Sequence, residues 1–351
     1  PKLMDTGLRR YGMIVKASLL AFLVSYSSVA EAGKIDAIKT HDGQVVWMSH
    51  DTALPLFALR LSFDHAGTAY DPKGKEGLAA FASRMMTEGA GDLPSRAFHE
   101  ALEDKAIDLD AGANEDRLSI SLDALSEHRV AAFGLLKKAL LSPRFEEADV
   151  ERVRKELLSE LKQVEEDPNY IAGREFDKIA YKDHPYSLPG LGTKESIQAI
   201  TVEDLKQYMT RHVTKAGITI SLSGDITREE AIALLSEALD ELPAAKEASS
   251  VPEAQLQASG LNMIYYQVPQ TVVSFALPGI KRDDPAFYAA YLMNYSLGGG
   301  TLTARLGEEI RRKRGLSYYV NSYLDIDEAS HIWRGGMAVR NDKAAQAIDL
   351  L

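Results

Sequence analysis

The sequence predicts an α+β protein, built from two related mixed α/β domains that a linker joins. Three observations lead to this prediction. An order of strands and helices that occurs before residue 243 begins again after residue 259. The stretch between them, 243–259, contains two prolines and several Ala and Ser and lacks periodicity, as linkers do. The second set of elements is the shorter one, so we expect a domain over 33–242 and an incomplete one over 260–351.

The elements of the first domain follow from the period of the apolar residues. Runs rich in apolar residues, or alternating with polar ones, predict strands at 45–48, 56–63, 107–122 and 218–222. Apolar residues at helical spacing predict helices at 76–87, 95–106, 126–141, 146–165, 201–209 and 228–241. Pro168 is expected to end the fourth of these helices, and Thr201 with Asp204 forms a capping box that opens the fifth.

The second domain repeats this pattern. Strands are expected at 261–267, 271–277 and 316–324, and helices at 285–297 and 303–314. Gly315 is expected to end the last helix, and Gly298, Gly299 and Gly300 to form a tight turn.

The N-terminus has the pattern of an export signal, which we assign to 1–32. Basic residues precede an apolar run over 17–24, and Ala30-Glu31-Ala32 is an A-x-A cleavage pattern. The run is short for a membrane span, and a retained anchor helix is the alternative. With no cysteine in the chain, we expect an exported protein of a bacterial periplasm, without disulfides or thiolate ligands.

Charge and motifs exclude several classes of function. The net charge of −11 argues against nucleic-acid binding. It is compatible with a preference for basic peptides, although net charge more often reflects solubility. Phosphate-binding loops and the G-x-S-x-G nucleophile motif are absent from the sequence.

An ordered set of segments resembles the pitrilysin/mitochondrial processing peptidase family, the inverted-motif zinc metallopeptidases. The segments are 77–85, 151–168, His184-Pro185-Tyr186, 192–197, 222–225, 298–300 and 311–319. The resemblance covers about residues 40–325 and implies a subunit of two related α+β domains.

The chain departs from that family at the metal site. Active members carry H-x-x-E-H, two histidines on one helix face that bind zinc and a glutamate that acts as general base. The matching positions here are Ala80, Ser83 and Arg84, while the family's third ligand falls on Glu160. One carboxylate is not a zinc site, and Arg84 would repel the metal, so we expect no metal in this chain. A solvated glutamate is the other interpretation of Glu160.

A replacement site is not apparent from the sequence. The eight histidines include no two at helical three- or four-residue spacing, and a site assembled from scattered histidines is the remaining route to a self-sufficient peptidase.

The resemblance implies a different role for the second domain. In two-subunit bacterial members, the subunit without the zinc motif supplies an arginine–tyrosine pair that binds substrate, and the matching residues here are Arg311 and Tyr318. Both can donate hydrogen bonds to a peptide carbonyl. Arg312 and Tyr319 are adjacent alternatives, and a cationic helix end with a core tyrosine is the structural interpretation.

We therefore expect a non-zinc, substrate-binding subunit of a heterodimeric periplasmic peptidase, inactive alone. Its partners would be a zinc-bearing homologue, or another copy of this chain, and a peptide, which strand 107–122 could take up along its edge. Zinc would belong to the partner subunit. A non-enzymatic scaffold or peptide-binding protein is the second hypothesis.

Overall fold

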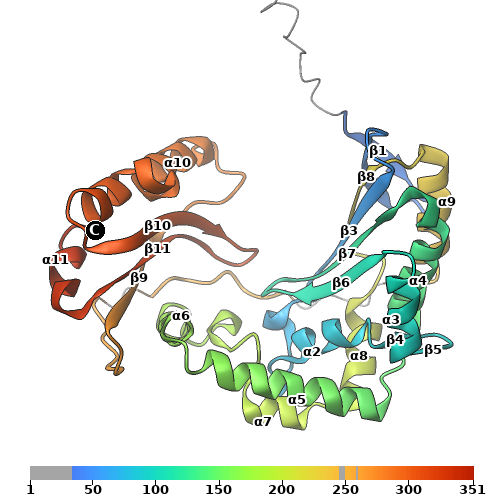
Figure 1. Cartoon of the computed structure of the whole chain (residues 1–351), viewed down its shortest axis with the longest axis horizontal. Helices are drawn as coiled ribbons and strands as arrows, with labels where there is room; N and C mark the ends of the chain where they lie inside the picture. The colour runs from blue at the N-terminus through green and yellow to red at the C-terminus, as the bar shows by residue number, and fades with distance from the viewer. Residues whose placement is uncertain (1–33, 245–249, 258–259) are drawn as a thin grey trace, which may run out of the picture.

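The chain folds into two lobes, each with its own sheet (Figure 1). The computed structural model describes residues 34–244, 250–257 and 260–351. The predicted export signal over 1–32 lies outside the described residues. The mixed α/β character and the presence of two lobes confirm the predicted fold class.

The first lobe contains a six-stranded sheet in the order β1-β2-β8-β3-β7-β6. All its pairings are antiparallel except that of β2 with β8, which is parallel. Strand β6 therefore lies at one edge of this sheet. The strands are β1 (Asp36–Lys39), β2 (Val45–His50), β3 (Leu56–Asp64), β6 (Asp108–Ala113), β7 (Arg117–Leu125) and β8 (Ile218–Gly224), with a small ribbon of β4 (Gly89–Ala90) and β5 (Leu93–Pro94).

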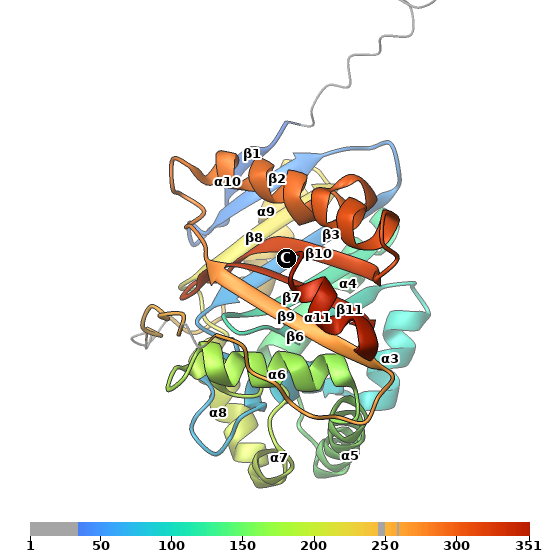
Figure 2. The same cartoon turned by 90° about the vertical axis from the view of Figure 1, so that its left-hand side faces the viewer.

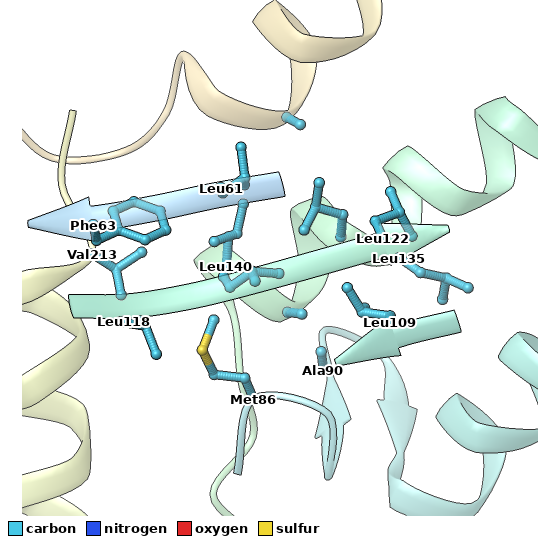
Figure 3. Close-up of a cluster of buried hydrophobic side chains, with 14 of the residues drawn as sticks. Leu61, Phe63, Met86, Ala90, Leu109, Leu118, Leu122, Leu135, Leu140 and Val213 are labelled. Carbon is cyan, nitrogen blue, oxygen red and sulfur yellow. The ribbon is translucent and has the colours of Figure 1, made fainter. Parts of the chain in front are cut away.

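Helices cover one face of this sheet, and their contact with the strands forms the main core. Leu61 and Leu122 of the central strands are both buried, and they face the buried Leu140 and Met86 in the close-up of Figure 3. The alternate residues Arg60 and Ser62 lie on the opposite face. The helices are α2 (Leu78–Met85), α3 (Ser95–Glu103), α4 (Arg129–Leu141), α5 (Glu147–Val164), α6 (Pro168–Ala180), α7 (Lys194–Ala199), α8 (Val202–His212) and α9 (Arg228–Leu239).

The second lobe contains a three-stranded antiparallel sheet in the order β10-β11-β9. One face carries helical segments, which pack on β10 and β11 (Figure 2). The elements are β9 (Gln270–Pro278), α10 (Phe287–Asn294), β10 (Ser317–Ile326), β11 (His331–Arg340) and α11 (Ala344–Ile348), with π-helical turns over Tyr295–Gly299 and Gly307–Arg312.

The two sheets share one arrangement. The order β10-β11-β9 matches β6-β7-β3 of the first lobe, since in both sheets the hairpin's second strand pairs with the strand that precedes the hairpin. This match gives the repeat expected from the order of elements a structural basis.

The predicted strand at 261–267 is wrong, because these residues form neither helix nor strand. Leu261, Met263 and Tyr265 are exposed instead. Since β9 matches β3, the segment before β9 corresponds to β2, the strand before β3. Strand β2 pairs with β8 and not with β3. Within the described residues the second lobe has no counterpart of β8, so the segment has no strand to pair with.

The predicted strand at 107–122 is a hairpin of two strands. Residues 114–116 form its turn, and Asn114 accepts the backbone N–H groups of Asp116 and Arg117 through its side chain. The alternating residues lie in β7, which pairs on both sides, while the free edge belongs to β6 alone.

The sequence reasoning missed α6, which contacts β9 of the second lobe beneath the sheet (Figure 2). Helix α5 ends at Val164, before Pro168, as expected. Pro168 also occupies the first position of α6, and Asp167 caps that helix by accepting the N–H of Asn169. A mixed cluster of Tyr181, Tyr186, Ala329 and Ile332 joins the two lobes next to α6.

The helices within the described ranges include none of sufficient length and hydropathy to cross a bilayer.

Candidate functional site

The positions of the family's zinc motif lie on α2, and α5 packs beside this helix. The pairing brings Arg84 onto Glu160, with 2.6 Å between Nη2 and Oε2. Both side chains are 38% exposed, so the ion pair is open to solvent. The carboxylate that would bind a metal is therefore occupied by a guanidinium from the neighbouring helix.

The other two positions offer no ligand. Ala80 has no donor atom. The hydroxyl of Ser83 donates to the carbonyl of Ala80 at 2.9 Å, within its own helix. Zinc takes about three protein ligands in catalytic sites, so these residues do not fit the metal. Across the part of the chain that the structure describes, no group of three or more His, Asp or Glu side chains is placed to hold a metal ion.

Arg311 and Tyr318 lie together in the second lobe. The guanidinium carbon of Arg311 is 4.5 Å from the centroid of the Tyr318 ring, which is the geometry of a cation–π contact. Tyr318 is 80% exposed, so it is not the core tyrosine of the structural interpretation. The contact holds an exposed phenol in one orientation, with a cation beside it.

The charge of Arg311 is not neutralised by a neighbour. Lys313 and Arg314, two and three residues further along, form ion pairs with Glu309. Arg311 forms no salt bridge with any residue within the described ranges. Its charge is thus available to a carbonyl or carboxylate that reaches the surface.

Local backbone irregularities place both side chains. Arg311 lies in the π-helical turn Gly307–Arg312, in which the N–H of Lys313 donates to the carbonyl of Glu308. Tyr318 lies in an irregularity of β10, where the register against β11 shifts between Ser317 and Val320. Single π-turns and β-bulges both recur at functional sites, since each changes the direction in which a side chain points.

A glycine ends the helix that carries Arg311. Gly315 has a φ of 59°, the left-handed conformation that glycine adopts without strain. Its N–H donates to the carbonyl of Arg311, and the next N–H, of Leu316, reaches Ile310. These two bonds form the expected helix stop, and they bring Tyr318 back beside Arg311.

The adjacent alternatives have different surroundings. Tyr319 is 43% exposed, and its hydroxyl donates to Asn169 Oδ1 of α6 at 3.3 Å. It therefore bridges the two lobes. Arg312 is exposed and, within the described part of the chain, has no ion pair. The geometry favours Arg311 with Tyr318 as the pair.

The glycines at 298–300 have a packing role. They do not form an isolated tight turn, because Tyr295–Gly299 continues α10 as a π-helical turn. A Cβ at Gly298 would lie 2.3 Å from Ser322 Oγ and 2.8 Å from Ser322 N. Only glycine allows this turn to lie so close to β10, the strand that also carries Tyr318.

A shallow hollow lies on the face of the first sheet opposite its helices. Its volume is about 400 Å³, and its floor includes Arg60, Ser62 and Ser121. Residues Asp110 and Gly112 of the edge strand β6 lie at its side. A free strand edge beside such a hollow can accept an extended peptide through main-chain hydrogen bonds.

Sequence reasoning gave no role to Asp116 or Tyr186, which lie between the lobes. The hydroxyl of Tyr186 donates to Asp116, and both side chains are buried. The only signal for Tyr186 in the sequence was its place in the segment His184-Pro185-Tyr186, which carried part of the resemblance. Its contact with the turn before β7 is non-local and could not be read from spacing.

Two family models match consecutive parts of the chain. The model described as Insulinase (Peptidase family M16) matches residues 46–194, and that described as Peptidase M16 inactive domain matches residues 199–351.

Individual proteins extend this match. A protein of Helicobacter pylori named non-peptidase homolog YmxG is 29% identical over 299 residues, which are 85% of this chain and 69% of that protein. A protein of Bacillus subtilis named uncharacterized zinc protease YmxG is 22% identical over 264 residues, 75% of this chain and 64% of that protein. The crystal structure of a peptidase M16 inactive domain from Pseudomonas fluorescens is similar to this chain, with a TM-score of 0.82 and 29% identity. The match covers 90% of this chain and 78% of that protein's chain.

Proposed function

This chain belongs to peptidase family M16, and because an ion pair fills its metal position, we propose that it is the non-zinc, substrate-binding subunit of a heterodimeric peptidase that degrades peptides. A zinc-bearing homologue is the partner and supplies the metal. The relative named a non-peptidase homologue supports the absence of independent activity.

One observation carries the proposal. Arg311 and Tyr318 contact each other at the surface, with the phenol 80% exposed. A pair with only a structural role would gain most from burial or from an ion pair. Tyr318 is not buried, and the half-buried Arg311 forms no ion pair within the described residues. Its arrangement instead suits a ligand that arrives from outside the chain.

The chemistry of the pair suits peptide hydrolysis. When water attacks a peptide carbonyl, negative charge develops on the carbonyl oxygen. The guanidinium of Arg311 and the hydroxyl of Tyr318 both donate hydrogen bonds, and fixed donors at that oxygen lower the barrier. The partner's zinc activates the water, while these two residues hold the substrate near the scissile bond.

A strand edge and the N-terminal pattern support the remaining parts of the proposal. Strand β6 has a free edge and is the candidate for adding the peptide as an extra strand. The pattern at 1–32 and the absence of cysteine favour export to a bacterial periplasm.

Hydrolysis of a mixed set of fluorogenic peptides tests the proposal. The purified chain alone should cleave none of them, with or without zinc. Addition of the homologue with an intact H-x-x-E-H motif should produce cleavage that a chelator abolishes. Cleavage by this chain alone, or equal cleavage by the homologue with and without this chain, would contradict the assigned role.

A second candidate is a non-enzymatic peptide-binding or scaffold protein. The solvent-open ion pair of Arg84 and Glu160 favours this candidate equally, since the ion pair shows only that side chains fill the metal position. The two candidates differ in one outcome. A scaffold would bind the homologue or a peptide while leaving the rate of hydrolysis unchanged.

A further inference from the structure

The turns of two matching hairpins meet between the lobes. The β6–β7 hairpin of the first lobe has its turn at 114–116, and the β10–β11 hairpin of the second lobe has its turn at 327–330. Figure 1 shows the second hairpin extending toward the first lobe beside β6 and β7. The two turns therefore belong to corresponding hairpins of the two sheets.

Hydrogen bonds join the two turns through one tyrosine. The N–H of Glu328 donates to Asp116 Oδ2 at 2.7 Å, and the N–H of Ala329 donates to the hydroxyl of Tyr186 at 3.0 Å. The same hydroxyl donates to Asp116. Ser330 Oγ and the hydroxyl of Tyr181 add a bond of 2.8 Å. The tip of the second hairpin is thus bound to the first lobe at several points.

The contact brings acidic groups together from both lobes. The first lobe contributes Glu115 and Asp116, and the second contributes Asp325, Asp327 and Glu328. Like charges at close range repel one another, and in a partly buried setting water screens them poorly. The contact therefore forms against an electrostatic cost that depends on how many of these groups are ionised.

Two basic groups offset part of this cost. Arg334 lies 3.7 Å from Asp325 and 3.6 Å from Asp177 of α6. His65 Nδ1 lies 3.4 Å from Glu328 Oε1 and also shares a hydrogen bond with the hydroxyl of Tyr70. Neither contact reaches Asp327, which, like Glu115 and Asp116, has no ion pair in the described residues.

Burial, first, and the nearby carboxylates of Asp325, Asp116 and Glu115 together raise the pKa of Asp327 to about 7, against the opposing charge of Arg334. The ordinary value for this carboxyl is 3.8. When the lobes separate, Asp327 returns toward that value. The joined state therefore holds its proton more tightly than the separated state.

We propose that the contact between these two hairpin turns is a latch that fixes the spacing of the lobes, and that it loosens when Asp327 ionises. The sign follows from proton linkage. A carboxyl with a raised pKa stabilises the joined state fully below its ordinary value, and this stabilisation is lost as the pH rises through about 4 to about 7. The lobes should be joined in acid and separate more readily at neutral and higher pH.

The latch also acts on the arginine–tyrosine pair. The hairpin whose tip forms the latch begins at Ser317, and Tyr318 is the second residue at this opposite end of β10 (Ser317–Ile326). Rotation of this hairpin would displace Tyr318 relative to the first lobe. The latch requires neither a partner nor a substrate, so it can be tested on the chain alone.

The absence of cysteine allows the distance between the lobes to be measured directly. Spin labels would be attached to Val130→Cys in α4 and Tyr288→Cys in α10, whose native side chains are 70% and 73% exposed. Double electron–electron resonance would then give the distance distribution between about pH 5 and about pH 8. The comparison uses this labelled parent and the same protein carrying Asp327→Asn, Tyr186→Phe or Asp349→Asn.

In the parent, the ratio of separated to joined molecules should rise with pH, by up to about tenfold per pH unit below pH 7. Asp327→Asn should make this rise clearly shallower, and Asp325 and Asp177, whose pKa values burial also raises, account for any remaining slope. Tyr186→Phe should favour the separated form at every pH, since it removes one acceptor and one donor of the latch. Asp349→Asn, at an exposed carboxyl of the same lobe, should behave as the parent does.

Two outcomes would overturn the latch. One is a distance distribution in the parent that is independent of pH and unaffected by Tyr186→Phe. The other is an equal response to pH in the parent and in Asp327→Asn, which would assign the change to other groups.

Discussion

The guanidinium of Arg84 lies 2.6 Å from the carboxylate of Glu160, across the contact between α2 and α5. This cation pairs with the residue that corresponds to the family's third zinc ligand. The positive charge of the metal is thereby replaced by that of a side chain, and the carboxylate keeps an ionic partner without any metal.

Restoring two ligands should restore metal binding. Ala80→His with Arg84→His would place two imidazoles at i and i+4 on one face of α2 and would free Glu160, which makes three ligands. We expect about one zinc per chain, measured by elemental analysis after dialysis. The same variant with Glu160→Gln is the control and should bind zinc more weakly. Failure of the double variant to bind zinc, in a folded protein, would show that α2 and α5 do not present these positions to one point.

Removing the arginine–tyrosine pair should slow the complex without breaking it. Arg311→Ala with Tyr318→Phe deletes two hydrogen-bond donors, and loss of even one donor to a developing oxyanion costs about 10²-fold in turnover. The kcat of the reconstituted complex should fall by at least this factor while gel filtration still shows the assembled form. Arg312→Ala is the matched control, since this adjacent arginine is exposed and lies outside the contact with Tyr318. Equal effects of the two substitutions would remove Arg311 from the proposed site.

Two glycines should respond oppositely to alanine. A Cβ at Gly298 would meet Ser322 at 2.3 Å, so Gly298→Ala should lower the free energy of unfolding by about 1–3 kcal/mol. Gly134 is exposed within α4, with nothing within 4 Å of its added Cβ. Gly134→Ala should raise that free energy by up to about 1 kcal/mol through helix propensity. Urea denaturation measures both changes, and a neutral Gly298→Ala would mean that β10 moves away at little cost.

His212 should make the protein less stable in mild acid. Burial lowers the pKa of this imidazole, whose Nδ1–H donates to the carbonyl of His65 at 2.7 Å. Below the ordinary pKa of 6.5, the imidazole of His212 is protonated in the unfolded chain while it is still neutral in the folded chain. The stability is therefore present above pH 6.5 and is lost as the pH falls from there toward the folded-state pKa, by up to about 1.4 kcal/mol per pH unit.

Denaturation at several pH values isolates this contribution. His212→Gln should show a shallower loss of stability in acid than the parent protein, since glutamine does not titrate. His41→Gln, at an exposed histidine, should keep the parent's pH dependence. An unchanged slope in His212→Gln would assign the acid sensitivity to other groups.

Local rules of sequence accounted for much of the first lobe. The periods of apolar residues located its long helices, and the capping box at Thr201 and Asp204 is present as expected. The helix expected over 146–165 ends before Pro168 as predicted, but the same rules missed that this proline also begins the next helix.

Pairing between distant residues could not be predicted in this way. Apolar residues at 261–267 have strand character, yet a strand forms only beside another strand. The pairing of Arg84 with Glu160 also depends on how α2 packs against α5. Missing ligands could be recognised from the motif, but the side chain that replaces the metal appears only in three dimensions.

Strand β9 is an edge of its sheet, because β11 pairs with only one of its sides. In an antiparallel strand, successive amide protons point alternately to the two sides. Half of the amides of β9 are therefore bonded to β11, while the other half have no strand partner among the described residues. In heavy water, deuterium uptake along this strand should alternate from one residue to the next, a comb-like signature that would vanish once a second strand covers the open side.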